Sequence, residues 1–484
     1  MESSAWAAWS VALPLAAAAV AIGGWRAGRI AAYLTAILAP VVASGTLQAV
    51  RETGPLRHPL GGWGAPLGIE LHVDGLSALM LAATAVVGAL TTLYAGAYFN
   101  RTTGRWFWVV WLLLWTSLNG VFVSDDVFNL YVMLELLGLS AVALVALAAT
   151  RDATVAAMRY FLVSMAGSLL FLLGIALLYA RYGTLSLTLL GLVAEPDAAS
   201  LLALSVMTLG MMAKTAIFPL HAWLPPAHAS APTPASAVLS GLVVKASFYV
   251  LLRLWLEVFG AAAGGFEAAL LVLGALGAGA VLWGSVLALR QRTIKLLIAY
   301  STVAQLGYLF ILFPLIAAAG PWAETAWQGG IYQVISHACA KASMFLAAGS
   351  MVKAVGADRL PALAGIGHRL PISFTAFGIG GLSLVGMPPS GGFIAKWLLL
   401  SAALGSGSWI WALVLVLGSL LAAGYVFLVL RHAFERSPEA ARPTRPVPRR
   451  MEAAALLLAL VALGLGIVAA PPLDLLGPLP GGAP

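Results

Sequence analysis

The segment Met212–Arg253 reads MAKTAIFPLHAWLPPAHASAPTPASAVLSGLVVKASFYVLLR. Two lysines, Lys214 and Lys245, lie inside long apolar stretches, and a proline-rich patch with His221 and His228 separates them. Proline removes a backbone donor and disfavours helix in the residue before it, so one continuous helix cannot cover the patch. Amines inside apolar stretches, beside an interrupted backbone, predict an ion-translocating centre in a membrane protein.

The composition supports a polytopic membrane protein. Of 484 residues, 61% are hydrophobic and only 9% are charged, whereas soluble domains carry about 25% charged residues. Apolar runs of about 20 residues, long enough to cross a bilayer as a helix, recur along the whole chain. The net charge of +8 does not indicate a nucleic-acid partner, because the cations sit in short connections between these runs.

We predict an all-α protein with fourteen transmembrane helices. The first eight spans are expected near 5–24, 30–50, 73–99, 106–124, 127–150, 156–180, 201–221 and 232–256. Six more are expected near 267–289, 294–318, 327–352, 371–403, 407–430 and 451–470. A basic linker, Ser437–Arg450, should precede the last span and could contact anionic lipid or a partner subunit.

Loop charges predict the orientation. Glu2 precedes the first span and Arg26 and Arg29 follow it, which favours an uncleaved first span that starts outside. Of the 26 lysines and arginines, 18 then fall in inward connections and four lie within spans. The four cations expected in outward loops are Arg51, Arg57, Arg181 and Arg253. Such an asymmetry fits the positive-inside rule and places both termini outside the cell membrane.

The four lysines within spans are Lys214, Lys245, Lys341 and Lys396. Each costs about 2.5–3.5 kcal/mol to place at the centre of a helix in a bilayer, so their retention predicts a function. Glu135 is the one acid expected deep in a span, and it can pair with only one or two of them. A buried amine shifts its protonation when a carboxylate partner moves, which is the property of a proton relay. The alternative is that these charges only hold the bundle together.

Other polar side chains accompany the lysines. His337 and Lys341 are four residues apart and share one helix face, which favours His337 as a proton carrier over a structural residue. His221 and His228 beside the proline-rich patch could be relay or structural residues. A polar stripe along the tenth span could bridge helices or hold a file of water; it comprises Ser301, Gln305 and Tyr308.

Two spans should be broken, the seventh between Phe218 and Pro234 and the twelfth at GMPPSGG, residues 386–392. Spans four to eight form one block of five and spans nine to thirteen form a second, and the fourth span of each block is broken. Because each block has an odd number of spans, the second block has the opposite orientation in the membrane. Inverted repeats with broken helices point to an ion site at the membrane midplane. The expected units are residues 1–105, 106–258, 259–435 and 436–484.

Four segments resemble one protein family. They are similar to segments of the antiporter-like membrane subunits of respiratory complex I, energy-converting hydrogenases and Mrp antiporters, and the D-type subunit of Mrp is nearest in style. The four segments read MAKTAIFPLHAWLPPAHASAPTPASAVLSGLVVKASFYVLLR, RTIKLLIAYSTVAQLGYLF, ISHACAKASMFLAAGS and GMPPSGGFIAKW. The resemblance covers roughly residues 70–435 and implies fourteen helices, two inverted five-helix units and a central polar axis.

The resemblance also implies roles for individual residues. Glu135, in LYVMLELLGLS, corresponds to the glutamate of the fifth helix, and Lys214 to its lysine partner in the seventh. Lys245 corresponds to the central lysine of the eighth helix. The remaining positions are His337 and Lys341 in the eleventh helix and Lys396 in the twelfth.

The sequence therefore predicts a proton-translocating subunit of a multi-subunit Mrp-like, hydrogenase-like or complex I-like assembly in the plasma membrane. Walker A, HExxH and CxxC motifs are missing from the sequence and Cys339 is the lone cysteine, so we expect no bound cofactor, metal or redox centre in this chain. Three alternatives stay open: a sodium/proton antiporter module without redox input, a structural scaffold, and an ion-coupled partner of bicarbonate uptake.

Overall fold

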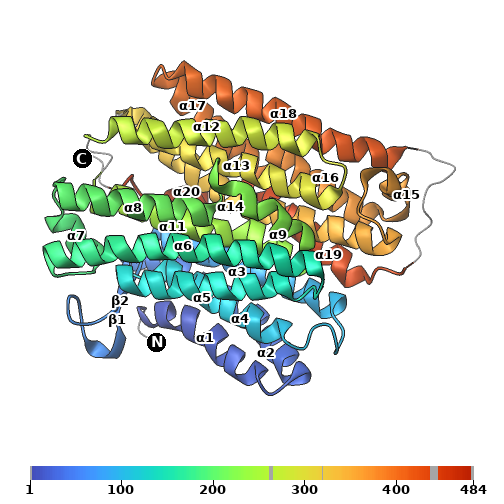
Figure 1. Cartoon of the computed structure of the whole chain (residues 1–484), viewed down its shortest axis with the longest axis horizontal. Coiled ribbons are helices and arrows are strands. Elements are labelled where there is room, and N and C mark those ends of the chain that lie inside the picture. Colours follow the sequence, from blue (N-terminus) through green and yellow to red (C-terminus); the bar gives the residue numbers. More distant parts are fainter. Residues whose placement is uncertain (1–2, 261–264, 319, 436–444, 481–484) are drawn as a thin grey trace.

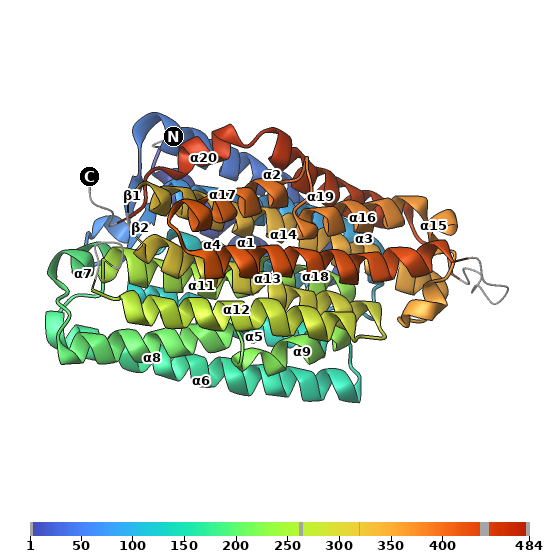
Figure 2. The ribbon, with the colours of Figure 1, turned by 90° about the horizontal axis from the view of Figure 1, so that it is seen from above.

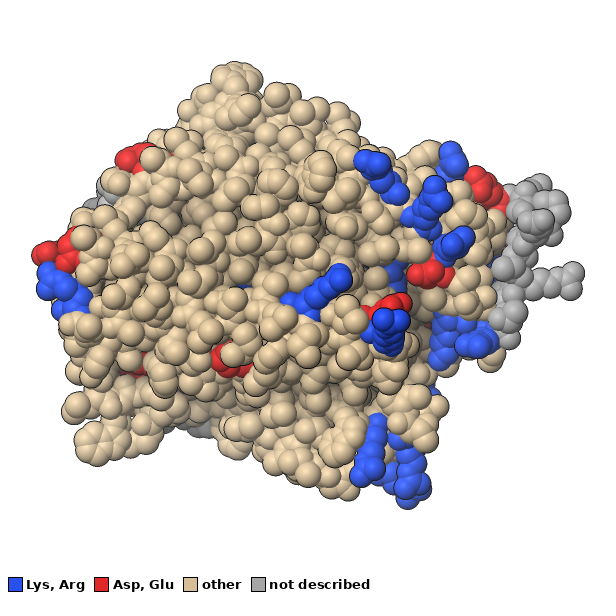
Figure 3. Space-filling view, viewed as in Figure 1, with Lys and Arg blue, Asp and Glu red and all other residues tan. Residues whose placement is uncertain are grey.

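A computed structural model describes residues 3–260, 265–318, 320–435 and 445–480. The long helices run in one common direction in both views of the ribbon (Figures 1 and 2). One end carries strands β1 (Leu56–Pro59) and β2 (Glu70–Val73) and helix α7 (Leu187–Val193), and we call it the hairpin end. The opposite end carries α15 (Ile366–Arg369), and we call it the basic end. On the face shown in Figure 3, most of the visible lysines and arginines gather at the basic end.

Within the described residues, eleven helices are long and apolar enough to cross a membrane. Four shorter apolar helices accompany them, and they are α1, α4, α16 and α17. Backbone donors and acceptors that face hydrocarbon must be satisfied within the segment, which a helix achieves along its whole length. The chain is thus an all-helical polytopic membrane protein, as predicted.

The first helices and the one hairpin precede the region of the lysines. Their bounds are α1 Ala5–Ala21, α2 Trp25–Thr53, β1 Leu56–Pro59, a 3₁₀ turn Leu60–Gly62, β2 Glu70–Val73, α3 Gly75–Tyr98 and α4 Phe107–Val123. The strands are antiparallel and pair Leu56 with Val73 and Pro59 with Glu70, inside a connection predicted only as a loop. Asp125 N–H donates to Glu70 O at 3.2 Å, so β2 is fixed to the segment that follows α4.

The seventh predicted span is broken, as expected. The elements from the fifth helix to this break are α5 Val127–Ala146, α6 Arg151–Tyr182, α7 Leu187–Val193, α8 Ala198–Thr215, a 3₁₀ turn Leu220–Trp223 and α9 Leu224–Ser230. Ala216, directly after α8, adopts the left-handed conformation with φ 58° and ends the helix. The break leaves Lys214 in the last turn of α8, where the partial negative charge of a helix C-terminus favours a cation.

The eighth span was predicted as one helix, but it contains two π-helical turns. The order is α10 Thr233–Val238, π turn η3 Leu239–Val243, α11 Val244–Arg253 and π turn η4 Leu254–Val258. A π turn adds a residue to the helical turn and frees backbone groups locally, and such turns concentrate at functional sites. Lys245 follows the first of these turns by two residues.

The second half of the chain also consists mainly of long helices, with one break. The elements are α12 Glu267–Leu289, α13 Ile294–Ala317, α14 Pro321–Val355, a 3₁₀ turn Leu360–Leu363, α15 Ile366–Arg369, α16 Pro371–Val385, α17 Gly391–Gly405, α18 Trp409–Phe434, α19 Arg449–Ile467 and α20 Ala470–Leu476. The break between α16 and α17 confirms the interruption predicted at residues 386–392. Most of the predicted linker, residues 437–444, lies outside the described residues, and its last two residues belong to α19.

The core of the bundle consists of the helices that carry the polar residues. The segment Thr233–Val258 is buried throughout its apolar window, and α13 and α14 are nearly so. By contrast, fewer than half of the residues in the apolar windows of α5, α6 and α18 are buried. Lys245 and Lys341 therefore lie on the innermost helices, furthest from lipid.

Candidate functional site

Lys214 and Glu135 form a buried ion pair. Lys214 Nζ lies 3.2 Å from Glu135 Oε1 and 3.2 Å from Ser164 Oγ, and Ser168 Oγ donates to the same carboxylate oxygen. The side chain of Lys214 is 7% exposed, and that of Glu135 is 18% exposed. The pair thus joins α5 to the broken end of α8, and it is the pairing that the family resemblance implied.

Two glycines bring α6, which carries Ser164 and Ser168, against α8. A Cβ on Gly210 of α8 would lie 2.4 Å from Gly167 O, and a Cβ on Gly167 of α6 would lie 2.7 Å from Gly210 O. Atoms do not approach this closely without a shift of the backbone, so only glycine fits at both positions. This direct contact between the backbones of α6 and α8 brings Lys214 within hydrogen-bond distance of Ser164.

Lys245 is fully buried and is bound by the π turn before it. Its Nζ donates to Ser240 O, and Ser240 Oγ lies 2.8 Å from Thr302 Oγ1 on α13. Thr302 Oγ1 donates to Ile298 O at 3.0 Å, and Lys341 Nζ donates to the same carbonyl at 2.8 Å. Lys245 and Lys341 are consequently connected through hydrogen bonds of two neighbouring helices.

The polar stripe of α13 continues from Lys341 toward α16. Lys341 Nζ also donates to Ser301 Oγ, at the start of the stripe. One turn further along, Gln305 accepts from Gln333 Nε2 at 2.9 Å and donates to Leu384 O at 3.3 Å. The stripe thus bridges helices, which is one of the two functions predicted for it.

Lys396 is bound at the second helix break. Its Nζ donates to Leu384 O at 2.7 Å, to Val385 O at 3.3 Å and to Ser419 Oγ at 3.2 Å. The two carbonyls belong to the last turn of α16, whose helical acceptors end where the break begins. Hydrogen bonds to a charged group contribute about 1.5–3 kcal/mol each, so three of them offset the cost of burying one lysine. Leu384 O is shared with Gln305, which connects Lys396 to the stripe.

The histidines lie near the lysines without being bonded to them. His337 and His228 are buried, and within the described part of the chain neither ring nitrogen of either residue has a hydrogen-bond partner. His337 precedes Lys341 on α14 by four residues, so the two side chains share one helix face. The His221 ring stacks on Phe218, with ring centroids 5.8 Å apart.

One cluster was missed by sequence reasoning. Arg253 was predicted in an outward loop, which is wrong: it ends α11, is 4% exposed and donates to both oxygens of Asp74 at 2.6 and 2.7 Å. It also pairs with Glu257 and lies 4.9 Å over the ring of Tyr249. The sequence already indicated part of this cluster, because Tyr249, Arg253 and Glu257 follow Lys245 at intervals of four residues and so share its helix face. The buried cations therefore include an arginine in addition to the four lysines.

Asp74 caps the first turn of α3 outside the spans. Burial on its own would raise the pKa of the Asp74 carboxyl, but the charge and hydrogen bonds of Arg253 lower this pKa well below its usual range. Since the folded pKa is depressed, the pair stabilises the fold above the unfolded pKa of about 3.9, and this contribution is lost as pH falls toward the folded pKa.

We predict that Asp74→Asn lowers the free energy of unfolding by about 3 kcal/mol at neutral pH, the lower end for breaking a buried pair, because Asp74 is 22% exposed. Thermal unfolding of the purified chain in detergent measures this change. The matched control is Glu70→Gln, which removes an ion pair whose arginine, Arg57, is 44% exposed; here we expect about 1 kcal/mol or less. Equal losses in the two variants would contradict the assignment.

Buried basic residues beside helix breaks are features of membrane proteins that bind or move ions. Residues 124–422 match the family described as NADH:quinone oxidoreductase/Mrp antiporter, TM. The chain is 38% identical over 454 residues to NADH-quinone oxidoreductase subunit N of Desulforudis audaxviator strain MP104C, covering 90% of this chain and 89% of that protein. The chain belongs to this family of antiporter-like membrane subunits.

Two further relatives come from Mrp systems. The D-type subunit of the Na(+)/H(+) antiporter of Bacillus subtilis strain 168 is 29% identical over 88% of this chain and 86% of its own length. A chain in the structure of the Mrp complex from Dietzia sp. DQ12-45-1b superimposes with a TM-score of 0.89 at 25% identity, covering 98% of this chain and 96% of that one. These relatives are subunits of multi-subunit membrane complexes.

Proposed function

We propose that this chain is a proton-translocating subunit of a multi-subunit assembly in the plasma membrane. The observation that carries the proposal is the connected row of buried polar groups from Lys245 through Lys341 and the α13 stripe to Lys396. Buried polar atoms usually have a partner, and ordered water supplies it where protein does not. His337, one turn before Lys341 on α14, would complete a hydrated axis.

Protons are taken up near Lys245, pass along the axis and leave near Lys396. A pocket of about 560 Å³ at the basic end, lined by Lys295 and Thr233 among others, supports uptake from that end. His228 lies in α9, two residues before Ser230, which lines this pocket. The Glu135–Lys214 pair acts as the electrostatic gate, because its geometry sets how strongly a positive charge is held beside the axis.

Fourteen spans and two inverted repeats are part of the proposal. The eleven candidate spans, together with α1, α4 and the α16–α17 pair taken as one broken helix, give this number. The two breaks share a backbone pattern: Ile217 N donates to Met212 O, and Met387 N donates to Leu382 O. The residue before each donor, Ala216 or Gly386, is left-handed. The basic end would face the cytoplasm, which places both termini outside.

The test is proton transport by membrane vesicles that contain the native complex with Lys245→Ala in this chain. We expect transport to fall by about 100-fold or more, because the first station of the axis loses its proton carrier. Native gel electrophoresis of the same membranes should show an assembled complex. Normal transport in this variant would instead support a structural scaffold.

Repeating the transport measurement with and without sodium separates the two ion-handling functions. A flux that needs no sodium supports proton translocation driven by a redox partner. A strict requirement for sodium on the opposite side of the membrane would favour the sodium/proton antiporter module, which the Bacillus relative makes a specific candidate.

A further inference from the structure

A second row of polar residues leaves the axis at Lys245. Tyr249, Arg253 and Glu257 follow at intervals of four residues, so they lie on the same face as the lysine. At 1.5 Å per residue, Lys245 and Glu257 are about 18 Å apart along the helix, slightly more than half of the roughly 30 Å hydrocarbon thickness. This row leads from the innermost lysine to the hairpin end, opposite to the pocket with Lys295.

A hydroxyl pair lies in the middle of this row. Tyr249 Oη is 2.9 Å from Ser77 Oγ on α3, and it also donates to Phe122 O at 2.9 Å. Tyr249 is 5% exposed and Ser77 is fully buried. A hydroxyl both donates and accepts, so the tyrosine can turn from the carbonyl to the serine and reverse the direction of the pair.

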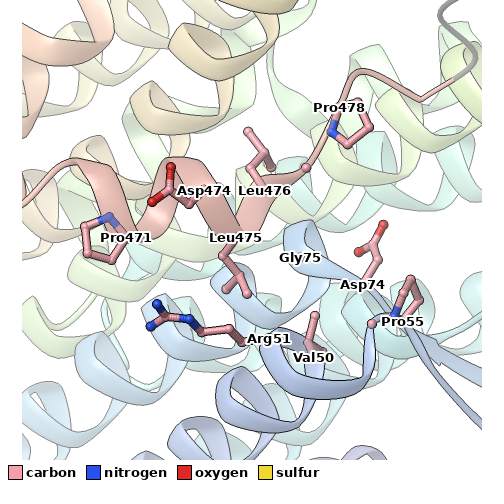
Figure 4. Close-up of a pocket in the computed structure, with 12 residues that line it drawn as sticks. Val50, Arg51, Pro55, Asp74, Gly75, Pro471, Asp474, Leu475, Leu476 and Pro478 are labelled. Carbon is pink, nitrogen blue, oxygen red and sulfur yellow. The ribbon is translucent and has the colours of Figure 1, made fainter. Parts of the chain in front are cut away.

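The outer end of the row reaches solvent. Ser77 Oγ accepts from Arg253 Nη2 at 2.9 Å, and Ser77 N–H donates to Asp74 Oδ1 at 2.9 Å. Asp74 borders a pocket of about 440 Å³ between α2, the start of α3 and α20. Figure 4 shows its carboxylate on one side of this pocket, with Arg51 and Asp474 on the other.

We propose that this row is a second proton branch, which connects Lys245 to the hairpin end through Tyr249, Ser77 and Asp74. The inference rests on the proposed function, since it requires that Lys245 carries protons. The Lys245 ammonium gives up one proton and becomes an amine. The tyrosine and serine hydroxyls each accept one proton and pass on their own, and the Asp74 carboxylate receives one and releases it to the pocket. Of the links in this branch, the structure shows the hydrogen bond between Tyr249 and Ser77; ordered water would bridge Lys245 to Tyr249 and the Ser77 hydroxyl to Asp74.

Arg253 and Glu257 position the outer end of the branch. The guanidinium binds the carboxylates of both Asp74 and Glu257 and donates to Ser77 Oγ, so it fixes the acceptors around the serine. A positive group at this point also repels a proton that would dwell on the carboxylates, and release to the pocket is favoured. A purely structural tie between α3 and α11 would need the arginine and the acids, but it would not need the hydroxyl of Tyr249.

The experiment therefore removes hydroxyl groups and leaves the ion pairs intact. Tyr249→Phe and Ser77→Ala are introduced separately into the native complex, and proton flux is measured in vesicles in both directions. We expect each variant to lower the flux by about tenfold or more, with unchanged assembly. Ser77→Thr, which retains a hydroxyl, should restore the flux. Ser117→Ala is the matched control, because it removes a buried hydroxyl of α4 that donates to Leu114 O of its own helix.

The outcomes separate the branch from the proposed function. Native flux in Tyr249→Phe and Ser77→Ala, with Lys245→Ala inactive, would overturn the branch and leave the proposed function in place. Native flux in Lys245→Ala would overturn both. Loss of flux in Ser77→Ala that Ser77→Thr fails to rescue would also reject the branch, because the loss would then follow from packing.

Discussion

Replacing Glu135 by alanine is expected to reduce proton transport by the assembled complex to about one hundredth or less of the native rate. Lys214 Nζ would then lose its only carboxylate within the described residues and keep only Ser164 Oγ as a hydrogen-bond partner. An isolated buried amine favours its neutral form, so the gate could no longer hold a positive charge. Vesicle proton uptake measures the rate, and native gels of the same membranes measure assembly.

Lys214→Ala should have the same effect, and the double variant should be no worse than either single one, because residues that act as a pair are not additive. The matched control is Arg181→Ala, which also removes an ion pair, with Asp197 at 2.7 Å, but from the exposed surface of the hairpin end. Transport in this control should stay at the native level. An Arg181→Ala defect as large as that of Glu135→Ala would contradict a specific function of the buried pair.

Replacing Lys396 by glutamate should abolish transport and weaken the fold. Here the ammonium is surrounded by acceptors, namely two carbonyls of α16 and Ser419 Oγ. An ionised glutamate carboxylate would face the lone pairs of the two carbonyls, and of these three groups only the Ser419 hydroxyl could donate a hydrogen bond to it. Burying such a charge costs several kcal/mol. Lys396→Met, which removes the charge without adding an acceptor, is the comparison.

Transport and thermal unfolding of both Lys396 variants in the intact complex decide this prediction. Both variants should lose transport, but only Lys396→Glu should lower the unfolding temperature markedly. If Lys396→Glu unfolds and transports like the native chain, the carbonyls of α16 do not select the sign of the charge at this position.

Much of this architecture could be predicted because each signal was local. The break after Lys214 follows from proline chemistry, and the break at residues 386–392 follows from a run of glycine and proline. The depth of each lysine follows from counting residues along an apolar run. Pairing of Glu135 with Lys214 came from the family resemblance, since nothing in the spacing of two distant helices could have selected it.

Other parts depend on contacts between segments that are distant in sequence. Arg253 looked like a loop cation because it lies near the end of an apolar run, and only the arrival of Asp74, 179 residues earlier, makes its burial tolerable. The π turns beside Lys245 have no proline or glycine-rich signature. Lys341 is bound by Ile298 O of another helix, and a backbone acceptor of this kind leaves no mark in a sequence.

Two of the buried lysines are held by carbonyl oxygens of irregular helix turns, Lys245 by Ser240 O and Lys396 by Leu384 O. Each ammonium binds its carbonyl more strongly than the neutral amine would, so proton occupancy and local helix geometry are thermodynamically linked. Linkage of this kind is reciprocal: if protonation favours one geometry of the turn, the same free energy raises the proton affinity in that geometry. Helix distortion imposed by a neighbouring subunit would therefore act on the lysine as a change in proton affinity, without any direct contact.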